Sequence, residues 1–405
     1  MIFRWARFAK MDKKTAHGSP VYGLRELTGY FFKLGYSGFG GPVALVGYMH
    51  RDLVVKRGWI TEDEYKEGLA LAQLAPGPLA AQLGIYIGFI HYRVLGATLA
   101  GIAFIIPSFL MVVGLGIAYK LYGGLPWMQA VFYGVGASVI GIILLSAYKL
   151  TLKSVSKPNV KSIQANWLLW IIFLTGLIIT VLTQSEEVLF FILAGLIYMF
   201  VKAPPAALSF SKSSNSIFLF AGMGLWDYEP ETLSKIGLFF LKAGAFVFGS
   251  GLAIVPFLHG GVVNENHWLT ESQFVDAVAV AMITPGPVVI TVGFIGYLIA
   301  GFPGATVASV ATFLPCYLFT VIPAPYFNKI AKKGSIKAFV DGITAAVVGA
   351  LMGSVFVIAT RSIKDIPTLL IALASLLTLI YIKKIKEPVL ILLAAIIGII
   401  IKLVI

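Results

Sequence analysis

Long apolar segments occupy most of this chain and leave few positions for charged side chains. A helix that is apolar on every face is stable in a bilayer but not in water, and about 20 such residues cross the hydrocarbon core. Charged residues make up 12% of the chain, about half the usual share of a soluble domain. These features exclude a soluble globular protein and predict an all-α polytopic membrane protein.

The apolar segments fall into two sets of six, joined by a polar stretch that contains Pro and Ser, as a linker does. The first set lies at 29–49, 68–92, 94–119, 127–148, 166–183 and 187–201, and the second at 234–258, 274–299, 304–327, 336–359, 366–382 and 387–405. We therefore predict a basic N-terminal tail, a first transmembrane repeat, a linker and a second transmembrane repeat, at residues 1–23, 24–201, 202–232 and 233–405.

The two halves are copies of one another. A shift of 209 residues aligns 31–90 with 240–299 without a gap, and 19 of these 60 positions are identical. The identities include Lys33/Lys242, Gly40/Gly249, His50/His259, Trp59/Trp268, Glu62/Glu271 and Pro76-Gly77-Pro78/Pro285-Gly286-Pro287. Shared apolar composition cannot align such residues in one register. Internal duplication is typical of secondary transporters, whose substrate site lies at the repeat interface.

Equivalent loops of the two halves differ in charge. Residues 50–67 include four Lys or Arg, whereas residues 259–276 include none. Basic loops stay on the cytoplasmic side, so this contrast predicts inverted-topology repeats. Inversion needs an odd number of spans per half, most simply five spans and a re-entrant hairpin at Pro-Gly-Pro. The same topology places the basic N-terminus outside, which leaves the absolute orientation open.

A glycine-rich sequence follows an intramembrane lysine in each half. Glycines at bilayer depth break a helix, and the NH groups that begin the next helical segment favour an anion. A lysine within the membrane is costly unless it has a partner or a water-filled cavity. The alternatives are close helix packing for the glycines and snorkelling for the lysines. The substrate-binding residues predicted from this pattern are Lys33, Gly40, Gly41, Lys242, Gly249 and Ser250.

The two Pro-Gly-Pro sequences prevent a continuous helix, and nearby amide and hydroxyl side chains offer neutral donors. An ordinary kink without a ligand is the alternative. We predict that both sequences surround one central anion site. The corresponding substrate-binding residues are Gln73, Pro76, Gly77, Pro78, Gln82, Thr284, Pro285, Gly286, Pro287 and Thr291.

Acidic residues are rare in the apolar segments. Asp341 lies inside one, where a carboxylate suggests function, so we assign it to proton coupling, with a membrane-boundary position as the alternative. Glu67 and Asp276 occupy equivalent positions at segment starts, and we expect solvated helix ends there. No metal-binding pattern surrounds the histidines, and Cys316 is the only cysteine, so we expect no metal and no cofactor. The sequence contains no ATP-binding or hydrolase motif, which argues against an enzyme.

Three motifs resemble those of the chromate ion transporter family in its two-domain form. They are Phe39-Gly40-Gly41-Pro42, Trp59-Ile60-Thr61-Glu62 and Gln73-Leu74-Ala75-Pro76-Gly77-Pro78, repeated one half later. The resemblance covers the chain from about Leu24 on. In the second half the first motif is degenerate, reading Phe248-Gly249-Ser250-Gly251, so we do not expect the halves to bind anion equivalently.

The resemblance implies a secondary active transporter that exports chromate, with sulfate as the related oxyanion. It also implies that the proton motive force drives export and that the protein is a multi-pass protein of the bacterial cytoplasmic (inner) membrane. The implied partners are the oxyanion, protons and the lipid bilayer, without nucleic acid, and a homo-oligomer is left open. The alternatives are a transporter or channel for another inorganic anion and an integral-membrane enzyme.

Overall fold

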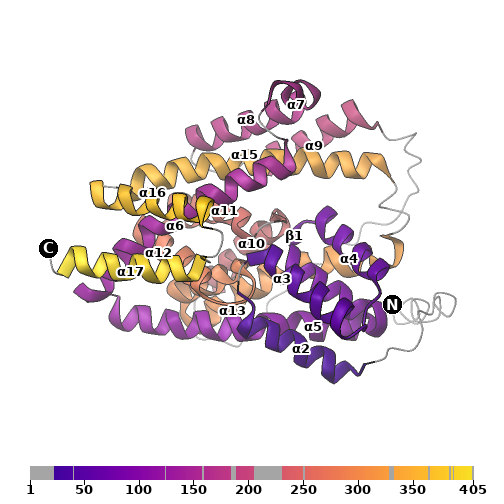
Figure 1. The fold of residues 1–405 in the computed structure, drawn as a ribbon, viewed down its shortest axis with the longest axis horizontal. Coiled ribbons are helices and arrows are strands. Elements are labelled where there is room, and N and C mark those ends of the chain that lie inside the picture. Colours follow the sequence, from indigo (N-terminus) through magenta and orange to yellow (C-terminus); the bar gives the residue numbers. More distant parts are fainter. Residues whose placement is uncertain are drawn as a thin grey trace.

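The computed structural model describes residues 22–39, 41–123, 125–156, 159–183, 188–204, 230–249, 251–327, 333–363, 365–382, 385 and 387–403. This part of the chain is almost entirely helical (Figure 1). Within it, four helical stretches are long and apolar enough to cross a membrane, namely Leu79–Tyr122, Pro126–Ser154, Val288–Tyr326 and Gly334–Ser362. The predicted all-α membrane fold is confirmed.

The first half runs from α2 to α9. Its helices are α2 (Leu24–Ser37), α3 (Gly41–Met49), the π-helix η1 (His50–Lys56), α4 (Glu62–Leu74), α5 (Leu79–Tyr122), α6 (Pro126–Ser154), α7 (Val160–Ala165), α8 (Trp167–Thr183) and α9 (Val188–Lys202). The two-residue strand β1 (Gly77–Pro78) lies between α4 and α5.

The second half repeats most of these helices in the same order, but its strand follows the first helix. It comprises α10 (Pro230–Ala245), strand β2 (Phe248–Gly249), the 3-10 helix η2 (Gly251–Ile254), α11 (Val255–His259), the π-helix η3 (Gly260–Glu265), α12 (Glu271–Ile283), the 3-10 helix η4 (Val288–Ile290), α13 (Thr291–Val321), the 3-10 helix η5 (Ala324–Tyr326), α15 (Gly334–Ser362), α16 (Ile366–Tyr381) and α17 (Glu387–Leu403).

Equivalent helices begin with the same capping interaction. The Thr61 hydroxyl accepts a hydrogen bond from the backbone NH of Glu64 at the start of α4, and Thr270 does the same with Gln273 at the start of α12. In both, the third residue of the helix bonds back to the threonine NH, which completes a capping box. The threonine that both halves share at this position, Thr61 in α4 and Thr270 in α12, therefore has a local structural reason.

Several predicted apolar segments are interrupted in the structure. The helix through 29–49 stops at Ser37 and restarts at Gly41, and the segment 68–92 is divided between α4 and α5. The glycine-rich and Pro-Gly-Pro sequences cause these interruptions because neither supports a continuous helical hydrogen-bond ladder.

Each long helix that follows a Pro-Gly-Pro sequence folds back on itself. The turn in α5 is at Arg93 (φ 53°), and the turn in α13 is at Gly301 (φ 62°). A side chain added at Gly88 would lie 2.3 Å from the Gly96 carbonyl oxygen, so the two arms of α5 touch through their backbones. Each of these elements is therefore a helical hairpin rather than one straight span.

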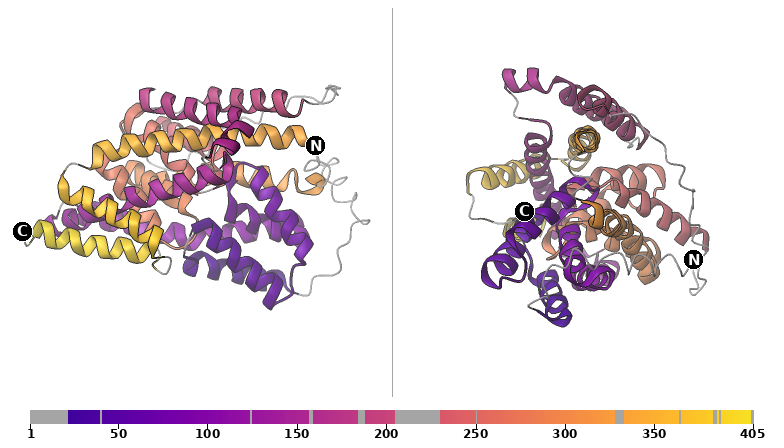
Figure 2. Two further views of the ribbon diagram at one scale, coloured as in Figure 1. Left: turned by 45° about the horizontal axis from the view of Figure 1, so that its top comes forward. Right: turned by 90° about the vertical axis from the view of Figure 1, so that its right-hand side faces the viewer.

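The last two helices of each half pack on the other half. Helix α6 contacts α16 and α17, and α15 contacts α8 and α9. Figure 1 draws α8 and α9 next to α15, along its upper edge, and Figure 2 turns the same helices to two further views. Glycines make both packings tight: a Cβ at Gly134 would lie 1.9 Å from the Ala394 carbonyl oxygen, and a Cβ at Gly349 would lie 2.1 Å from that of Phe173. The two halves are thus interlocked.

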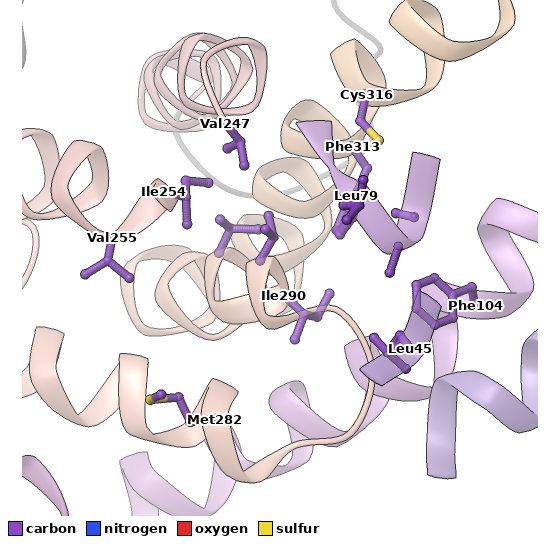
Figure 3. Packing of buried hydrophobic residues seen from close by; sticks show 14 of the residues in the cluster. Leu45, Leu79, Phe104, Val247, Ile254, Val255, Met282, Ile290, Phe313 and Cys316 are labelled. Carbon is purple, nitrogen blue, oxygen red and sulfur yellow. The ribbon is translucent and has the colours of Figure 1, made fainter. Parts of the chain in front are cut away.

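The central apolar core is shared by both halves (Figure 3). Its buried side chains include Leu45, Leu79 and Phe104 from the first half and Val247, Ile290 and Phe313 from the second. Several of them are neighbours of the interrupted segments, so the shared core fixes the position of the helix breaks.

Candidate functional site

Each Pro-Gly-Pro sequence pairs with the glycine-rich sequence of the other half. The Gly77 NH donates to the Val247 carbonyl at 2.5 Å, and β1 and β2 form a parallel pair. The Gly286 NH donates to the Gly38 carbonyl at 2.9 Å. These two bonds are equivalent under the 209-residue shift. The helix breaks of the two halves therefore meet across the repeat interface.

Both central glycines have a conformation that other residues rarely adopt. Gly77 has φ +144° and Gly286 has φ +99°. A Cβ at Gly286 would lie 2.0 Å from the Ser108 Oγ, and one at Gly77 would lie 2.7 Å from the Gln82 side chain. Glycine is required at both positions by backbone conformation and by space.

At each helix break a side chain bonds to the carbonyl of the first proline. The Gln82 amide donates to the Pro76 carbonyl at 2.9 Å. In the second half the Ser108 hydroxyl donates to the Pro285 carbonyl at 2.8 Å. These hydrogen bonds satisfy the backbone oxygens of Pro76 and Pro285 at the helix breaks.

A cavity of about 550 Å³, called cavity 1 below, lies beside these breaks. The residues that line it come from both halves, and they are Gly38, Phe39, Gly41, Pro42, Ala44, Leu79, Ile142, Ser146, Lys149, Leu150, Lys153, Met282, Thr284, Gly286, Val288, Glu387 and Pro388. The cavity thus contains both a glycine-rich sequence and a Pro-Gly-Pro sequence of the opposite half.

Cavity 1 has the electrostatics of an anion site. The N-terminal ends of three helices reach it, through Gly41 of α3, Leu79 of α5 and Val288 of η4. The first NH groups of a helix lack intrahelical acceptors and carry its positive dipole end. Lys149 and Lys153 add two ammonium groups to the wall. The ionisable lining residues are therefore two lysines and one carboxylate, Glu387, in a wall that is otherwise largely apolar.

A second cavity of about 710 Å³, called cavity 2 below, lies at the other end of α6. Its ionisable lining residues are Tyr119, Tyr133, Glu271, Asp276, Arg361, Asp365 and Lys402. Residues 126–137 of α6 reach cavity 2, and residues 142–153 reach cavity 1. On α12, likewise, cavity 2 extends to Asp276 and cavity 1 begins at Met282. About 8–9 Å of helix separates the two cavities.

The acidic groups at cavity 2 differ in their partners. Glu271 bonds to His259 at 2.8 Å and to Arg361 at 3.0 Å. Burial acts to raise the pKa of Asp365, but hydrogen bonds from the Thr368 backbone and from hydroxyl groups outweigh it and hold that pKa below its usual range. Asp276 is 5% exposed and accepts a hydrogen bond of 2.7 Å from the Tyr119 hydroxyl.

Comparison with known proteins identifies the family. A sequence model described as chromate transporter matches residues 25–200 and 234–399. The chain belongs to the chromate transporter family. A chromate transport protein of Cupriavidus metallidurans is 61% identical over 95% of both chains. A probable chromate transport protein of Synechococcus elongatus is 56% identical over 95% of this chain and 97% of its own length.

A more distant member of the family, a chromate transport protein of Pseudomonas aeruginosa, is 28% identical over 90% of this chain and 88% of its own. No solved structure matches this chain. Family membership makes the protein a multi-pass membrane transporter and not an enzyme.

The structure of this transporter brings together part of the predicted site. Gly41, Thr284 and Gly286 line cavity 1. Gly77, Pro78 and Gly249 form the strand pair, and Gln82, Pro76 and Pro285 take part in the hydrogen bonds described above. Pro287 precedes η4, and the Thr291 hydroxyl donates to the Val288 carbonyl at 2.8 Å. Gly40 and Ser250 lie outside the described residues.

Other predicted residues of the transporter lie away from both cavities. Lys33 and Lys242 are exposed on α2 and α10, and Gln73 is exposed on α4. Asp341 is half-buried in α15. None of these four described residues lines cavity 1 or cavity 2.

Sequence reasoning missed the most buried carboxylate of cavity 2. The expectation of a solvated helix end at Asp276 is wrong, because α12 packs against α6, α15 and α17 and buries this side chain. Asp276 aligns with Glu67, and this acidic residue in both halves was the sequence signal that could have marked Asp276 as functional. It also missed Lys149 and Lys153, which follow an apolar segment and give no pattern that separates them from ordinary loop lysines.

Proposed function

We propose that this chain is a secondary active transporter that exports chromate from the cytoplasm across the cytoplasmic membrane, driven by the proton motive force. Membership of the chromate transporter family and similarity to proteins named chromate transport protein support this substrate. The observation that carries the mechanism is cavity 1, where three helix N-termini and two lysines surround the helix breaks.

The chemistry of cavity 1 suits a small tetrahedral dianion. Helix NH groups and ammonium groups replace the water that the oxyanion loses on entry. The glycines allow the anion to approach the backbone, because no Cβ stands in front of the NH groups. Sulfate has the same charge and shape as chromate, so it competes for the same positive groups.

The two cavities provide a route across the protein. They reach the same helices, α6 and α12, from opposite ends. Between them lie buried apolar residues, including Val139 and Ile140 of α6 and Val278 of α12. We propose that this apolar layer is the barrier of the transport path and that it opens to one side at a time.

Helix directions support inverted repeats. The N-terminal end of α6 and the C-terminal end of its equivalent, α15, both line cavity 2, and the two helices contact each other. Equivalent helices that run in opposite directions are what inverted-topology repeats contain. The interrupted α4–α5 segment, which contains Pro76-Gly77-Pro78, then serves as the re-entrant element of the first half.

Charge supports a cytoplasmic opening for cavity 1, because Lys149 and Lys153 lie at the basic end of α6. The loops at Arg57 and Asn266 should then be on opposite sides of the membrane. Single cysteines placed there, in a Cys316→Ser background, should differ in labelling by an impermeant maleimide. Equal labelling from one side would contradict inverted repeats.

Three of the predicted binding residues that lie outside the cavities stay proposals. Lys33 and Lys242 are proposed to assist the anion from exposed positions, and Gln73 is proposed to take part after a movement of α4. The repeat limits 24–201 and 233–405 are kept. A homo-oligomer is kept as an option for the assembly.

Flux measurements on the purified protein test the proposed function. Proteoliposomes with the membrane potential clamped by valinomycin and equal potassium concentrations should accumulate chromate when their interior is more acidic. A channel would equilibrate chromate but not accumulate it. If sulfate or another anion accumulates and chromate does not, the proposed substrate is wrong. If chromate does not cross at all, the proposed function fails.

A further inference from the structure

Asp276 occupies an unusual place for a carboxylate. It is 5% exposed, it lines cavity 2, and it lies in α12, the helix whose C-terminal end reaches cavity 1 through Met282 and Thr284. A buried charge is costly unless it is paired, so such a residue needs an explanation.

The other acidic groups of cavity 2 have structural partners that hold them ionised. Glu271 bonds to the basic groups of His259 and Arg361, and Asp365 caps α16 through Thr368. The hydrogen-bond partner of Asp276 is instead the neutral phenol of Tyr119, which donates to Oδ2. The remaining carboxylate oxygen, Oδ1, is then the atom that can receive a proton.

The surroundings of Asp276 come from several helices. The ionisable groups that share its cavity are Tyr119 of α5, Tyr133 of α6, Glu271 of α12 itself, Arg361 of α15, Asp365 before α16 and Lys402 of α17. Arg361 is paired with Glu271, and the Lys402 ammonium lies 4.5 Å from the centre of the Tyr133 ring. Among the described residues that line this cavity, the basic groups of Arg361 and Lys402 thus interact with residues other than Asp276.

We infer that Asp276 is the proton-binding carboxyl of this transporter, and that α12 links proton binding in cavity 2 to anion binding in cavity 1. This inference rests on the proposed function, of which it names the coupling residue. A proton that enters from the side opposite the anion binds Asp276 and removes a buried charge. Helix α12 can then shift against α6, which moves Thr284 and Gly286 at the wall of cavity 1.

Asp276 then takes the proton-coupling role that the sequence predicts for Asp341. Asp341 is half-buried in α15 and lines neither cavity among the described residues. Glu67, the equivalent of Asp276 in α4, is also only half-buried. Asp341→Asn and Glu67→Gln are therefore matched controls for Asp276→Asn, since each removes one carboxylate of the same kind.

Chromate flux into proteoliposomes distinguishes a loss of proton coupling from a loss of chromate transport. For each proton exchanged per chromate, a pH difference of about one unit sustains about a tenfold chromate gradient when the membrane potential is zero. Asp276→Asn should lose this accumulation and keep chromate exchange across the membrane at about the wild-type rate. Asp276→Glu should regain accumulation with a shifted pH dependence, and both control variants should accumulate chromate as the wild type does.

Three results would overturn the inference. One is normal accumulation by Asp276→Asn. Another is the loss of exchange together with accumulation, which would assign Asp276 a structural role. The third is a loss of accumulation in Asp341→Asn with exchange intact, which would restore Asp341. An inactive wild-type protein would instead contradict the proposed function, so the two failures are distinguishable.

Discussion

Lys149 and Lys153 lie one helical turn apart on α6 and face the same cavity as three helix N-termini. A charged hydrogen bond contributes about 1.5–3 kcal/mol. Replacing either lysine by glutamine should therefore raise the KM for chromate about tenfold or more. Initial rates of chromate uptake into vesicles would measure this change.

The lysines outside cavity 1 provide the comparison. The sequence prediction assigns the anion to Lys33 and Lys242, which lie outside cavity 1. Glutamine variants of these two residues, measured in the same vesicles, separate the two assignments. If they raise the KM and the variants at 149 and 153 do not, the binding cations are not those of cavity 1.

Gly286 has a positive φ, and a Cβ added to it would lie 2.0 Å from the Ser108 Oγ. Both features disfavour a larger residue at this position. Gly286→Ala should lower the free energy of unfolding by about 1–3 kcal/mol. It should also reduce transport, because the residue lines cavity 1. Thermal unfolding of the detergent-solubilised protein would check the first effect.

Two further variants control this prediction. Gly114→Ala changes a helical glycine with open space around it and should leave the unfolding temperature unchanged or slightly higher. Gly286→Ala combined with Ser108→Ala removes the close oxygen and should recover part of the loss. An unchanged unfolding temperature for Gly286→Ala alone would show that the turn tolerates a Cβ.

At these residues the sequence predicted the breaks but not their partners. Glycine and proline restrict the backbone of their own neighbourhood, so an interruption at Pro76–Pro78 follows from the chain itself. The acceptor of the Gly77 NH is Val247, far away in the chain, and no local pattern encodes this pairing. The burial of Asp276 depends on three packed helices and was equally hidden.

At the level of elements, the equivalent helices α4 and α12 differ in their surroundings. All residues from Phe274 to Met282 of α12 are buried, whereas Gln73 and Lys66 of α4 are exposed. Two copies of one sequence unit thus occupy unequal positions in this state of the transporter. Exchange of these positions would carry the protein to its other state, with α4 packed and α12 released.

A disulfide tests whether α12 moves. A Cβ at Gly136 would lie 3.1 Å from Val275 Cγ1, which is suitable for a disulfide between α6 and α12. The variant Gly136→Cys/Val275→Cys, in a Cys316→Ser background, should transport when reduced and stop when oxidised. Single-cysteine variants should be insensitive to oxidation. Transport by the fully cross-linked protein would mean that α6 and α12 do not move apart.

The sequence predicted most elements because hydropathy and helix breakers act locally. It could not predict that α5 and α13 fold back at Arg93 and Gly301, since only the second of these turns has a glycine. Nor could it predict which half α16 and α17 pack against, because the sequence of an apolar helix face does not specify which other helix will cover it.

For the whole molecule, the interlocked packing predicts that neither half is stable alone. Separate chains that end at Pro204 and begin at Pro230 should each be degraded when expressed singly. Co-expressed, they should assemble, since α6 meets α16 and α17, and α15 meets α8 and α9. Copurification through a tag on one fragment, followed by chromate flux, would measure assembly.

A Gly349→Leu substitution in the second fragment serves as a control, because its side chain would meet the Phe173 carbonyl. It should weaken copurification. Stable, separately folded halves would contradict the interlocked arrangement.

The same packing also sets an order in time. Helix α9 is complete once Lys202 has been added, but α15, which α8 and α9 pack against, ends at Ser362, about 160 residues later. At roughly 5–20 residues per second, synthesis of that stretch takes about 8–32 s. During this interval the growing chain must keep α8 and α9 in the membrane without their final neighbour. The ribosome therefore delivers the first half long before its fold can be finished.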